Sequence, residues 1–226
     1  MILSAHQPAY LPWLGYFDKI IRSDVFIYLD TVQFEKNSFT NRNKIKTTQG
    51  SIWLTIPVIS KGHMNNTLKE IVIDNKQNWK KKHLTSIYQN YKKAPRFDVC
   101  YPKIEALYAK EYECLSDLCW DQLMFWLDEL RIKKQIVKSS TLPIDSKKSD
   151  LVFDLCKHFH ADRYISGALG RGYLQVADFK KEGIDVEFQD YQHPIYPQLY
   201  GNFIAYMGIV DFWMNTVDVS LITKVG

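Results

Sequence analysis

The chain has 226 residues, of which 46% are hydrophobic and 14% aromatic, so it can bury a substantial core and disorder is excluded as its main state. The formal net charge of +4 is small and the acidic residues are scattered among the basic ones, which indicates no general polyanion-binding surface and no clear nucleic-acid binding. The longest apolar stretches, such as residues 25–29, are far shorter than the roughly 20 residues that cross a bilayer. The first residues lack the basic region of a signal peptide, so we expect a cytoplasmic protein without membrane insertion.

The amino-terminal pattern predicts a strand at residues 1–5, an amphipathic helix at 13–21 and a buried strand at 25–29. A strand–helix–strand unit normally makes two parallel neighbours, and ligands collect at the carboxyl ends of such strands. His6 and Asp30 stand at two of these ends. The unit therefore predicts a parallel sheet with a ligand site at its carboxyl edge.

The middle of the chain changes character. Alternating or apolar runs separated by Gly50, Gly62 and an Asn pair predict a hairpin or meander, and two later runs with helical spacing predict core helices. We expect one domain over residues 1–226, with a β-meander and helical insertion around 44–130. The expected strands of the meander are 44–47, 52–58 and 68–73, and the expected helices are 77–91 and 115–130.

Alternation of strands and helices resumes after residue 130. The patterns predict a strand at 135–138, a helix at 149–159 capped by Ser149, strands at 163–166 and 184–188, and a helix at 207–215. The predicted fold class is α/β, with a mostly parallel sheet flanked by helices, a small antiparallel insertion and a helical region.

Cysteine and histidine spacing indicates no metal site. The four cysteines lack CxxC spacing, and Cys119 and Cys156 lie in apolar helical patterns where a small buried side chain is expected. His158 and His160 have no HExxH context or carboxylate in register. We expect reduced thiols and no bound metal.

A first polar block covers residues 6–16. Pro8 and Pro12 fix the backbone and remove amide donors, which suits a preformed ligand loop. An imidazole at a strand end binds phosphate or moves a proton near neutral pH, so His6 is a candidate catalytic residue. The alternative is a rigid connection whose aromatic side chains belong to the core and whose His6 bonds a backbone carbonyl.

A second polar block covers residues 30–44 and combines amides with cations after a buried strand. The planar fork of Arg42 suits phosphate or carboxylate, and Lys44 adds a point charge. The block predicts a recognition loop, and the alternative is a solvated hairpin with ordinary turn asparagines. Its candidate site residues are Asp30, Asn37, Asn41, Arg42 and Lys44.

A third polar block covers residues 164–173 and 190–198. Gly167, Gly170 and Gly172 follow a predicted strand, so backbone amides can approach an anion with Arg171 closing on it. The spacing matches neither the Walker pattern nor the dinucleotide fingerprint, and tight turns explain the glycines equally well. The other candidates in this block are Ser166, His193, Tyr196 and Gln198.

The blocks taken together resemble a known family. The run HQPxYLPWLGYF at residues 6–17, followed by NRNKI at 41–45, is similar to the WbqC-like family, and the resemblance spans the chain. Further similar features are WLTxPV at 53–58, YISG at 164–167 and the segment 191–198. The family is associated with gene clusters for O antigen and other surface polysaccharides, often those with N-acylated amino sugars.

The resemblance implies a pathway more firmly than a reaction. The leading hypothesis is an aminoacyl- or acyltransferase that forms an amide on a nucleotide-linked amino sugar. This sugar is the expected partner of the protein. An activated acyl donor or ATP is the only cofactor expected. The alternatives are an ATP-dependent amino-acid ligase on the same acceptor and a non-catalytic sugar-nucleotide-binding component; the oligomeric state stays open. The proposed catalytic residues are His6, Gln7, Asn41 and His193, and the proposed substrate-binding residues are Tyr10, Trp13, Asp30, Asn37, Arg42, Lys44, Ser166, Arg171, Tyr196 and Gln198.

Overall fold

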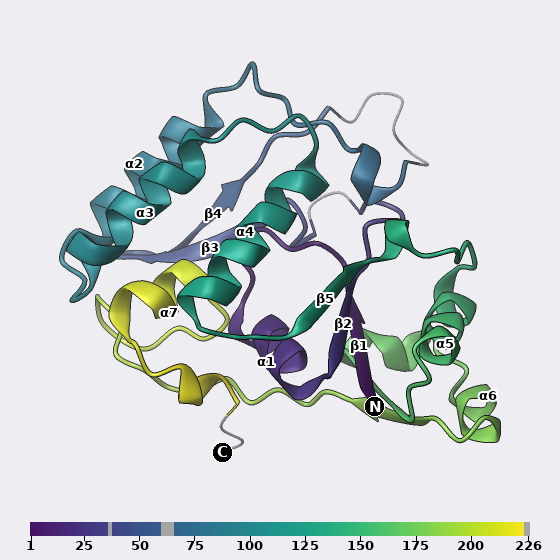
Figure 1. Ribbon diagram of the computed structural model, residues 1–226. Coiled ribbons are helices and arrows are strands. Elements are labelled where there is room, and N and C mark those ends of the chain that lie inside the picture. Colours follow the sequence, from purple (N-terminus) through teal and green to yellow (C-terminus); the bar gives the residue numbers. More distant parts are fainter. Residues whose placement is uncertain (36–37, 60–65, 224–226) are drawn as a thin grey trace.

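A computed structural model describes residues 1–35, 38–59 and 66–223 (Figure 1). The strands are β1 (Ile2–His6), β2 (Val25–Tyr28), β3 (Arg42–Thr47), β4 (Gly50–Thr55), β5 (Gln135–Lys138), β6 (Arg163–Ser166) and β7 (Asp185–Phe188). The helices are α1 (Leu14–Arg22), α2 (Trp79–Tyr91), α3 (Phe97–Ala109), α4 (Leu115–Glu129), α5 (Lys148–His158), α6 (Val176–Lys181) and α7 (Ile209–Asn215). Short 3-10 turns are η1 (Leu68–Glu70), η2 (Ser139–Thr141), η3 (Ala168–Gly172) and η4 (Val219–Ile222).

Within the described residues, a five-stranded parallel sheet has the order β5-β2-β1-β6-β7. The chain leaves β1 toward β2 and β5 on one side, and later returns to place β6 and β7 on the other. Helix α1 lies on one face of the sheet, and α5 and α6 lie on the opposite face (Figure 1). The strand order therefore reverses at β1, which is where open α/β sheets form a ligand crevice.

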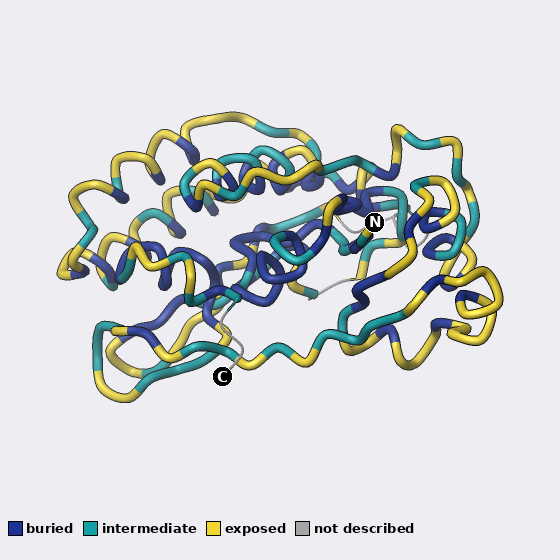
Figure 2. Tube along the Cα trace, turned by 60° about the horizontal axis from the view of Figure 1, so that its bottom comes forward, coloured by how far each residue is buried: buried dark blue, intermediate teal, exposed yellow. Residues whose placement is uncertain are grey.

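Two hydrophobic cores cover the two faces of the sheet because successive residues of a strand point to opposite sides. On β2, Val25 and Ile27 pack with α5 and α6, whereas Phe26 and Tyr28 pack with α1, α4 and α7. Figure 2 shows the buried segments gathered in the middle of the molecule and the exposed residues on the outer turns of its peripheral helices. Both cores therefore share the central strands.

The antiparallel hairpin β3–β4 pairs Arg42 with Thr55 and Lys44 with Trp53. Helices α2 and α3 pack beside it (Figure 1). Ile45 of β3 and Leu54 of β4 belong to the same core as α1, α4 and α7. The hairpin and its helices thus extend the core on the α1 face of the sheet.

The predicted fold class is confirmed, as are the strands and helices of the predicted parallel part. No helix among the described residues is long and apolar enough to cross a membrane. The predicted strand at 68–73 is wrong in its first half: Leu68–Glu70 form η1, where the Glu70 carboxylate accepts bonds from the Thr67 backbone amide and hydroxyl at 2.8 and 2.7 Å. This capping box favours a helical turn over a strand.

Two further differences concern helices. Ser149 lies inside α5, not at its N-cap, and its hydroxyl accepts a bond from the Gln175 backbone amide. Helix α3 is not among the predicted helices, and it contains Pro102 in its interior, a residue that helices normally exclude. Its buried residues nevertheless follow helical spacing, and they are Cys100, Ile104, Leu107 and Tyr108.

Candidate functional site

The site is built at the carboxyl end of β1, the strand at which the sheet order reverses. The loop after β1 is held from both sides. Leu11 has a φ of 44°, and its carbonyl oxygen accepts a bond of 2.6 Å from the Asn43 amide of β3. The backbone amide of Gly208 reaches the Lys44 carbonyl at 2.9 Å, and a Cβ on Gly208 would lie only 2.9 Å from the Leu11 oxygen. The loop therefore depends on a close backbone approach that glycine permits.

His6 is the last residue of β1 and is partly buried. Its Nδ1 lies 2.9 Å from the Gln7 carbonyl oxygen, and since a carbonyl only accepts, Nδ1 carries the proton and Nε2 has the lone pair. Trp13 and Tyr16 pack edge-on against the imidazole, at 5.4 and 4.8 Å between ring centres. Burial, assisted by the charge of Lys19, lowers the pKa of His6 from 6.5 to about 3. His6 is thus a neutral hydrogen-bond acceptor at physiological pH.

A buried lysine, Lys19, lies close to this histidine. Lys19 of α1 is 2% exposed, and its ammonium donates to the Ala5 carbonyl oxygen at 2.7 Å. Burial lowers the pKa of Lys19 from 10.5 to about 7, although the nearby charge of Asp18 opposes that shift. The Asp18 carboxylate in turn accepts a bond of 2.6 Å from Gln189, which follows β7. This bond fixes Gln189, and with it the segment after β7, to helix α1.

An aromatic surface extends from His6 to the hairpin. We call Trp13, Phe39 and Trp53 the aromatic platform, because their ring centres follow one another at 5.2 and 5.9 Å. Phe39 is 43% exposed and Trp53 is 41% exposed. The Arg42 guanidinium carbon lies 4.3 Å from the centre of the Trp53 ring, and the Lys44 ammonium nitrogen lies 4.8 Å from it. The platform thus combines flat apolar faces with two cations, as base stacking and phosphate binding require.

The segment after β7 borders the same surface. A Cβ on Gly15 would lie 2.8 Å from the Trp13 indole nitrogen and 3.0 Å from the Tyr191 ring, so these two side chains converge over Gly15. Tyr191 packs edge-on to His193 at 6.1 Å between ring centres. The convergence of Trp13 and Tyr191 at Gly15 places the segment 191–198 beside the His6 loop.

His193 has the same tautomer as His6. Its Nδ1 donates to the Pro194 carbonyl oxygen at 2.9 Å, and its buried Nε2 has no hydrogen-bond partner within the described parts of the chain. Burial lowers the pKa of His193 below 6.5. Tyr206, which is 54% exposed and has a φ of 60°, packs edge-on to this imidazole at 5.1 Å. His193 therefore offers a second acceptor nitrogen under an exposed tyrosine.

Tyr196 and Gln198 are held from below by a buried carboxylate. Asp211 of α7 accepts bonds from the Tyr196 hydroxyl at 2.8 Å and the Gln198 amide at 2.7 Å. It also accepts one from the Tyr91 hydroxyl of α2 at 2.7 Å, and the Lys46 ammonium donates to the Gln198 amide oxygen at 3.0 Å. Both predicted substrate-binding residues thus have their polar groups engaged in anchoring the segment.

Tyr10 lies in a separate, fully buried network. The His83 Nε2 lies 3.1 Å from the Thr55 carbonyl oxygen and must donate to it, which leaves Nδ1 to accept from the Tyr10 hydroxyl at 2.8 Å. Tyr10 then accepts from the Tyr108 hydroxyl. Burial lowers the pKa of His83 to about 4 and raises the pKa of Tyr10 well above 10. These groups stay neutral and join the His6 loop to α2, α3 and β4.

Asp30 joins two strand ends. One of its carboxylate oxygens accepts from the Ser139 hydroxyl and the Ser140 backbone amide, both at 2.8 Å, and the other accepts from the Ser140 hydroxyl at 2.6 Å. Asn41 is also buried: its amide nitrogen donates to the Ile56 carbonyl oxygen at 3.0 Å, while its Oδ1 has no partner in the part of the chain that the structure describes. Asn37 lies outside the described residues.

The end of β6 lies beside the end of β1, but the contacts of Arg171, which follows β6, lie on the other face of the sheet. The Ser166 hydroxyl donates to the Gly167 carbonyl oxygen at 3.0 Å. The Arg171 guanidinium carbon lies 4.5 Å from the centre of the Phe188 ring, and Phe188 packs with the core on the α5 and α6 face. His6 lies on the opposite, α1 face. The contacts therefore connect His6 through Trp13 with the cations of the second block and with the segment 191–198. Tyr10, Asp30 and Arg171 lie outside this group.

The sequence indicates Trp53 only through the family resemblance. Phe39 and Tyr191 are not among the predicted site residues. Trp53 could have been found from the hairpin, because a two-residue turn at 48–49 places it opposite Lys44 and on the same face as Arg42. The positions of Phe39 and Tyr191 depend on contacts between distant loops, for which no local pattern exists.

Burial disfavours the thiolate form of all four cysteines. Burial raises the pKa of Cys100 to about 11 and that of Cys156 to about 12, so neither forms a thiolate at neutral pH. Among residues 1–35, 38–59 and 66–223, no group of three or more His, Cys, Asp or Glu side chains is placed to hold a metal ion.

Comparison with known proteins identifies the family. The sequence model of the WbqC-like protein family matches residues 7–221. The chain belongs to this family. It is 32% identical over 211 residues to uncharacterized protein Rv1507c of Mycobacterium tuberculosis, which covers 92% of this chain and 91% of that protein. No solved structure gives a significant match. The predicted family resemblance is thus confirmed for this WbqC-like protein.

Proposed function

We propose that the protein is an aminoacyl- or acyltransferase that forms an amide on the amino group of a nucleotide-linked amino sugar, in the synthesis of O antigen or another surface polysaccharide. The observation that carries the proposal is the contact of His6, with its Nε2 lone pair, with Trp13, from which the aromatic platform extends to Trp53 and the cations Arg42 and Lys44. The nucleotide base stacks on the platform, and the diphosphate binds the two cations.

In the proposed step the sugar amine attacks the acyl carbon of an activated donor. The new C–N bond forms, the bond from the acyl carbon to the donor's leaving group breaks, and the amine proton passes to Nε2 of His6. The pKa of about 3 in the protein without substrate makes His6 a weak base. A bound diphosphate near the imidazole raises that pKa, because negative charge favours the protonated form. Gln7 is the proposed donor to the oxyanion, and His193 is the second candidate base. Asn41 is a proposed donor only through its second amide N–H, because the first donates to the Ile56 carbonyl oxygen.

The first test is a thermal-shift panel of dTDP- and UDP-linked amino sugars, their hydroxyl counterparts, ATP and coenzyme A. A ligand at a hundred times its Kd stabilises the fold by about 2.7 kcal/mol, which shifts Tm by several degrees. A shift specific to an amino sugar nucleotide supports the proposal. A shift with ATP alone, followed by release of AMP or pyrophosphate, would support the ligase instead.

The second test separates catalysis from binding. With the acceptor identified, we expect His6→Ala to lower kcat roughly 100-fold or more and to change acceptor binding only modestly. His158→Ala, which removes an exposed histidine from the end of α5, is the matched control and is expected to change neither. A variant that keeps its turnover would remove His6 from the mechanism.

The low pKa of His6 favours a second candidate function. An imidazole that stays neutral down to about pH 3 is suited to accept a hydrogen bond from a bound sugar without moving a proton. In that case the protein is a sugar-nucleotide-binding component, and His6→Ala changes the Kd of the nucleotide sugar while no amide product forms with any donor.

A further inference from the structure

His193 carries a buried nitrogen with no partner. Its Nδ1 donates to the Pro194 carbonyl oxygen, so the lone pair is on Nε2, and Nε2 is buried without a hydrogen bond among the residues that the structure describes. An unpaired buried acceptor costs roughly 1–3 kcal/mol, whereas a hydroxyl or amine placed against it would satisfy it. Nε2 of His193 is therefore suited to a ligand with an O–H or N–H group, if such a ligand can reach it.

Four aromatic side chains surround this imidazole, with ring centres between 5.1 and 6.1 Å from its own. We call them the aromatic cage, and they are Tyr191, Tyr196, Phe203 and Tyr206. The first three are held in place. The Tyr191 hydroxyl donates to the Ile222 carbonyl oxygen at 3.1 Å, and the Tyr196 hydroxyl donates to the buried Asp211 carboxylate. Phe203 packs edge-on to Tyr196 at 5.2 Å and against the core on the α1 face.

Tyr206 differs from the other members of the cage. It is 54% exposed, and its hydroxyl has no hydrogen-bond partner within the described ranges of the chain. The ring contact with His193, at 5.1 Å between centres, is the one that the described residues give it. Exposed side chains change rotamer within nanoseconds, and here a rotation breaks no hydrogen bond. Tyr206 is therefore the wall of the cage that can move.

The backbone that carries Tyr206 is fixed on both sides. Before it, the Ile204 amide donates to the Gln198 side-chain oxygen, and the Gln198 side-chain amide donates back to the Ile204 carbonyl oxygen, both at 2.9 Å. After it, the Gly208 amide donates to the Lys44 carbonyl oxygen at 2.9 Å. These bonds hold Tyr206 at a left-handed φ of 60° that a tyrosine rarely adopts.

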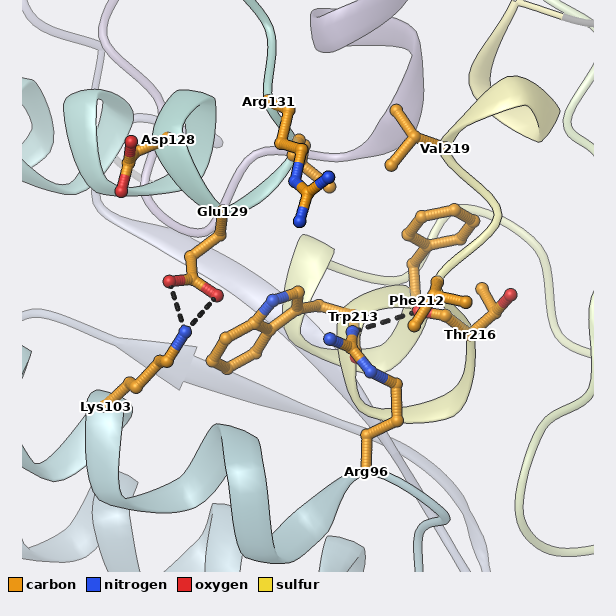
Figure 3. A pocket seen from close by; sticks show the side chains of 11 residues that line it. Arg96, Lys103, Asp128, Glu129, Arg131, Phe212, Trp213, Thr216 and Val219 are labelled. Carbon is orange, nitrogen blue, oxygen red and sulfur yellow. Dashed lines mark hydrogen bonds and ion pairs between the residues drawn. The ribbon is translucent and has the colours of Figure 1, made fainter.

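Helix α7, which begins directly after Gly208, is anchored at its far end as well. Figure 3 shows this carboxyl end beside α3 and the end of α4. The Arg96 guanidinium donates to the carbonyl oxygens of Trp213 and Thr216 at 2.6 and 3.1 Å (Figure 3). With the helix and the preceding loop both held, a movement at Tyr206 is confined to its side chain.

We propose that Tyr206 is a gate over His193. Its ring closes the movable wall of the aromatic cage, and rotation of its side chain opens Nε2 of His193 to the hydroxyl or amino group of a bound sugar. The choice of a sugar as the ligand rests on the proposed function, whereas the gate rests on the contacts around His193. Tyr206 thus controls access to the second candidate base and takes no part in the transfer itself.

The first test measures access to Nε2 in the free protein, by modification with diethyl pyrocarbonate and mass spectrometry of the peptide that contains His193. The Nε2 lone pair attacks a carbonyl carbon of the reagent, an N–C bond forms, ethyl carbonate leaves, and the Nδ1 proton passes to solvent. Exposed His158 is the internal reference. A gate that is open in a tenth of the molecules makes His193 react roughly tenfold more slowly than His158.

Two variants separate the gate from the rest of the cage. Tyr206→Asn removes the ring, and asparagine tolerates the left-handed φ, so we expect the modification rate of His193 to rise roughly tenfold toward that of His158. The matched control Tyr206→Phe retains the ring and should leave the rate unchanged. His83, which is buried in a different network, should stay unreactive in both variants and reports that they are folded. An unchanged His193 rate in Tyr206→Asn would overturn the gate, as would a wild-type His193 that reacts as fast as His158.

The second test concerns the ligand and uses the hydroxyl counterparts of the dTDP- and UDP-linked amino sugars, which have no amine to consume the reagent. In Tyr206→Asn, where the gate is absent, a bound sugar nucleotide is expected to slow the modification of His193. Protection of His6 without protection of His193 would show that the sugar does not reach Nε2 of His193. Absence of binding by every nucleotide sugar would count against the proposed function, while the rates in the free protein still decide the gate.

Discussion

At the scale of single residues, Gly170 shows how close packing explains a glycine that sequence reasoning had considered for an anion cradle. A Cβ built on Gly170 would lie 1.9 Å from the Ser166 hydroxyl oxygen and 3.2 Å from Leu174. Since Ser166 is buried at the end of β6, the side chain cannot move aside freely. We expect Gly170→Ala to lower the free energy of unfolding by about 1–3 kcal/mol, measured by urea denaturation.

Two further variants test the cause of this effect. Gly172→Ala adds a methyl group in the same turn where nothing lies within 4 Å, so it is expected to be neutral or slightly stabilising. In a Ser166→Ala background the clashing oxygen is absent, and Gly170→Ala should then cost clearly less than it does alone. An equal cost in both backgrounds would show that the Ser166 hydroxyl is not the source of the strain.

At the scale of elements, helix α7 connects the segment 191–198 with helix α2. The Asp211 carboxylate accepts bonds from Tyr91, Tyr196 and Gln198, and all of these groups are donors. Burial raises the pKa of Asp211, whereas the three donated bonds and the charge of Lys46 oppose that shift. The carboxylate is suited to this place because both of its oxygens accept.

We expect Asp211→Asn to lower the free energy of unfolding by about 3 kcal/mol or more. Asparagine replaces one carboxylate oxygen by an NH2 group, so a donor would face the hydroxyl and amide donors that this oxygen accepts from. Tyr91→Phe removes one bond to the carboxylate and the acceptor of the Lys46 backbone amide, and it is expected to cost roughly 2 kcal/mol. Asp145→Asn, an exposed change in the loop before α5, is the control and should stay within about 0.5 kcal/mol. Urea denaturation of the three variants gives the comparison, and an Asp211→Asn protein as stable as the control would disprove the anchoring role.

At the scale of the whole molecule, the two cores share the central strands. Val25 and Ile27 of β2 face one core while Phe26 and Tyr28 face the other, and the core on the α1 face continues into the β3–β4 hairpin. Loss of either core would expose one face of the strands on which the other core also packs. This continuity favours unfolding as a single unit, and the prediction of one domain over residues 1–226 leads to the same expectation.

We therefore expect one unfolding transition in urea. Tryptophan fluorescence reports mainly on the α1-face core, which contains or contacts Trp13, Trp79, Trp120, Trp126 and Trp213. Far-UV circular dichroism reports on all helices, including α5 and α6. The two normalised curves should coincide. Loss of helical signal at lower urea than the change in fluorescence would instead indicate that the α5 and α6 side unfolds first.

Sequence periodicity by itself determined the parallel part of the fold. The strand–helix–strand unit at the amino terminus, the later strands and the fold class all follow from local spacing, because a buried strand or helix face needs apolar residues at fixed intervals. The same reasoning placed His6 and Asp30 at strand ends. Helix α3 is not among the predicted elements. It contains Pro102, which disfavours a helix locally, and its stability comes from the packing of its buried face.

Only the tertiary structure decided which polar residues face one another. Arg42 and Lys44 reach Trp53 through hairpin pairing, and Tyr191 reaches Trp13 through contacts between segments far apart in sequence. The Tyr10 side chain lies in the core, where it contacts His83, and the Arg171 side chain lies on the opposite face of the sheet. Local spacing specifies an element and its buried side, whereas the direction of a loop side chain depends on the long-range packing around it.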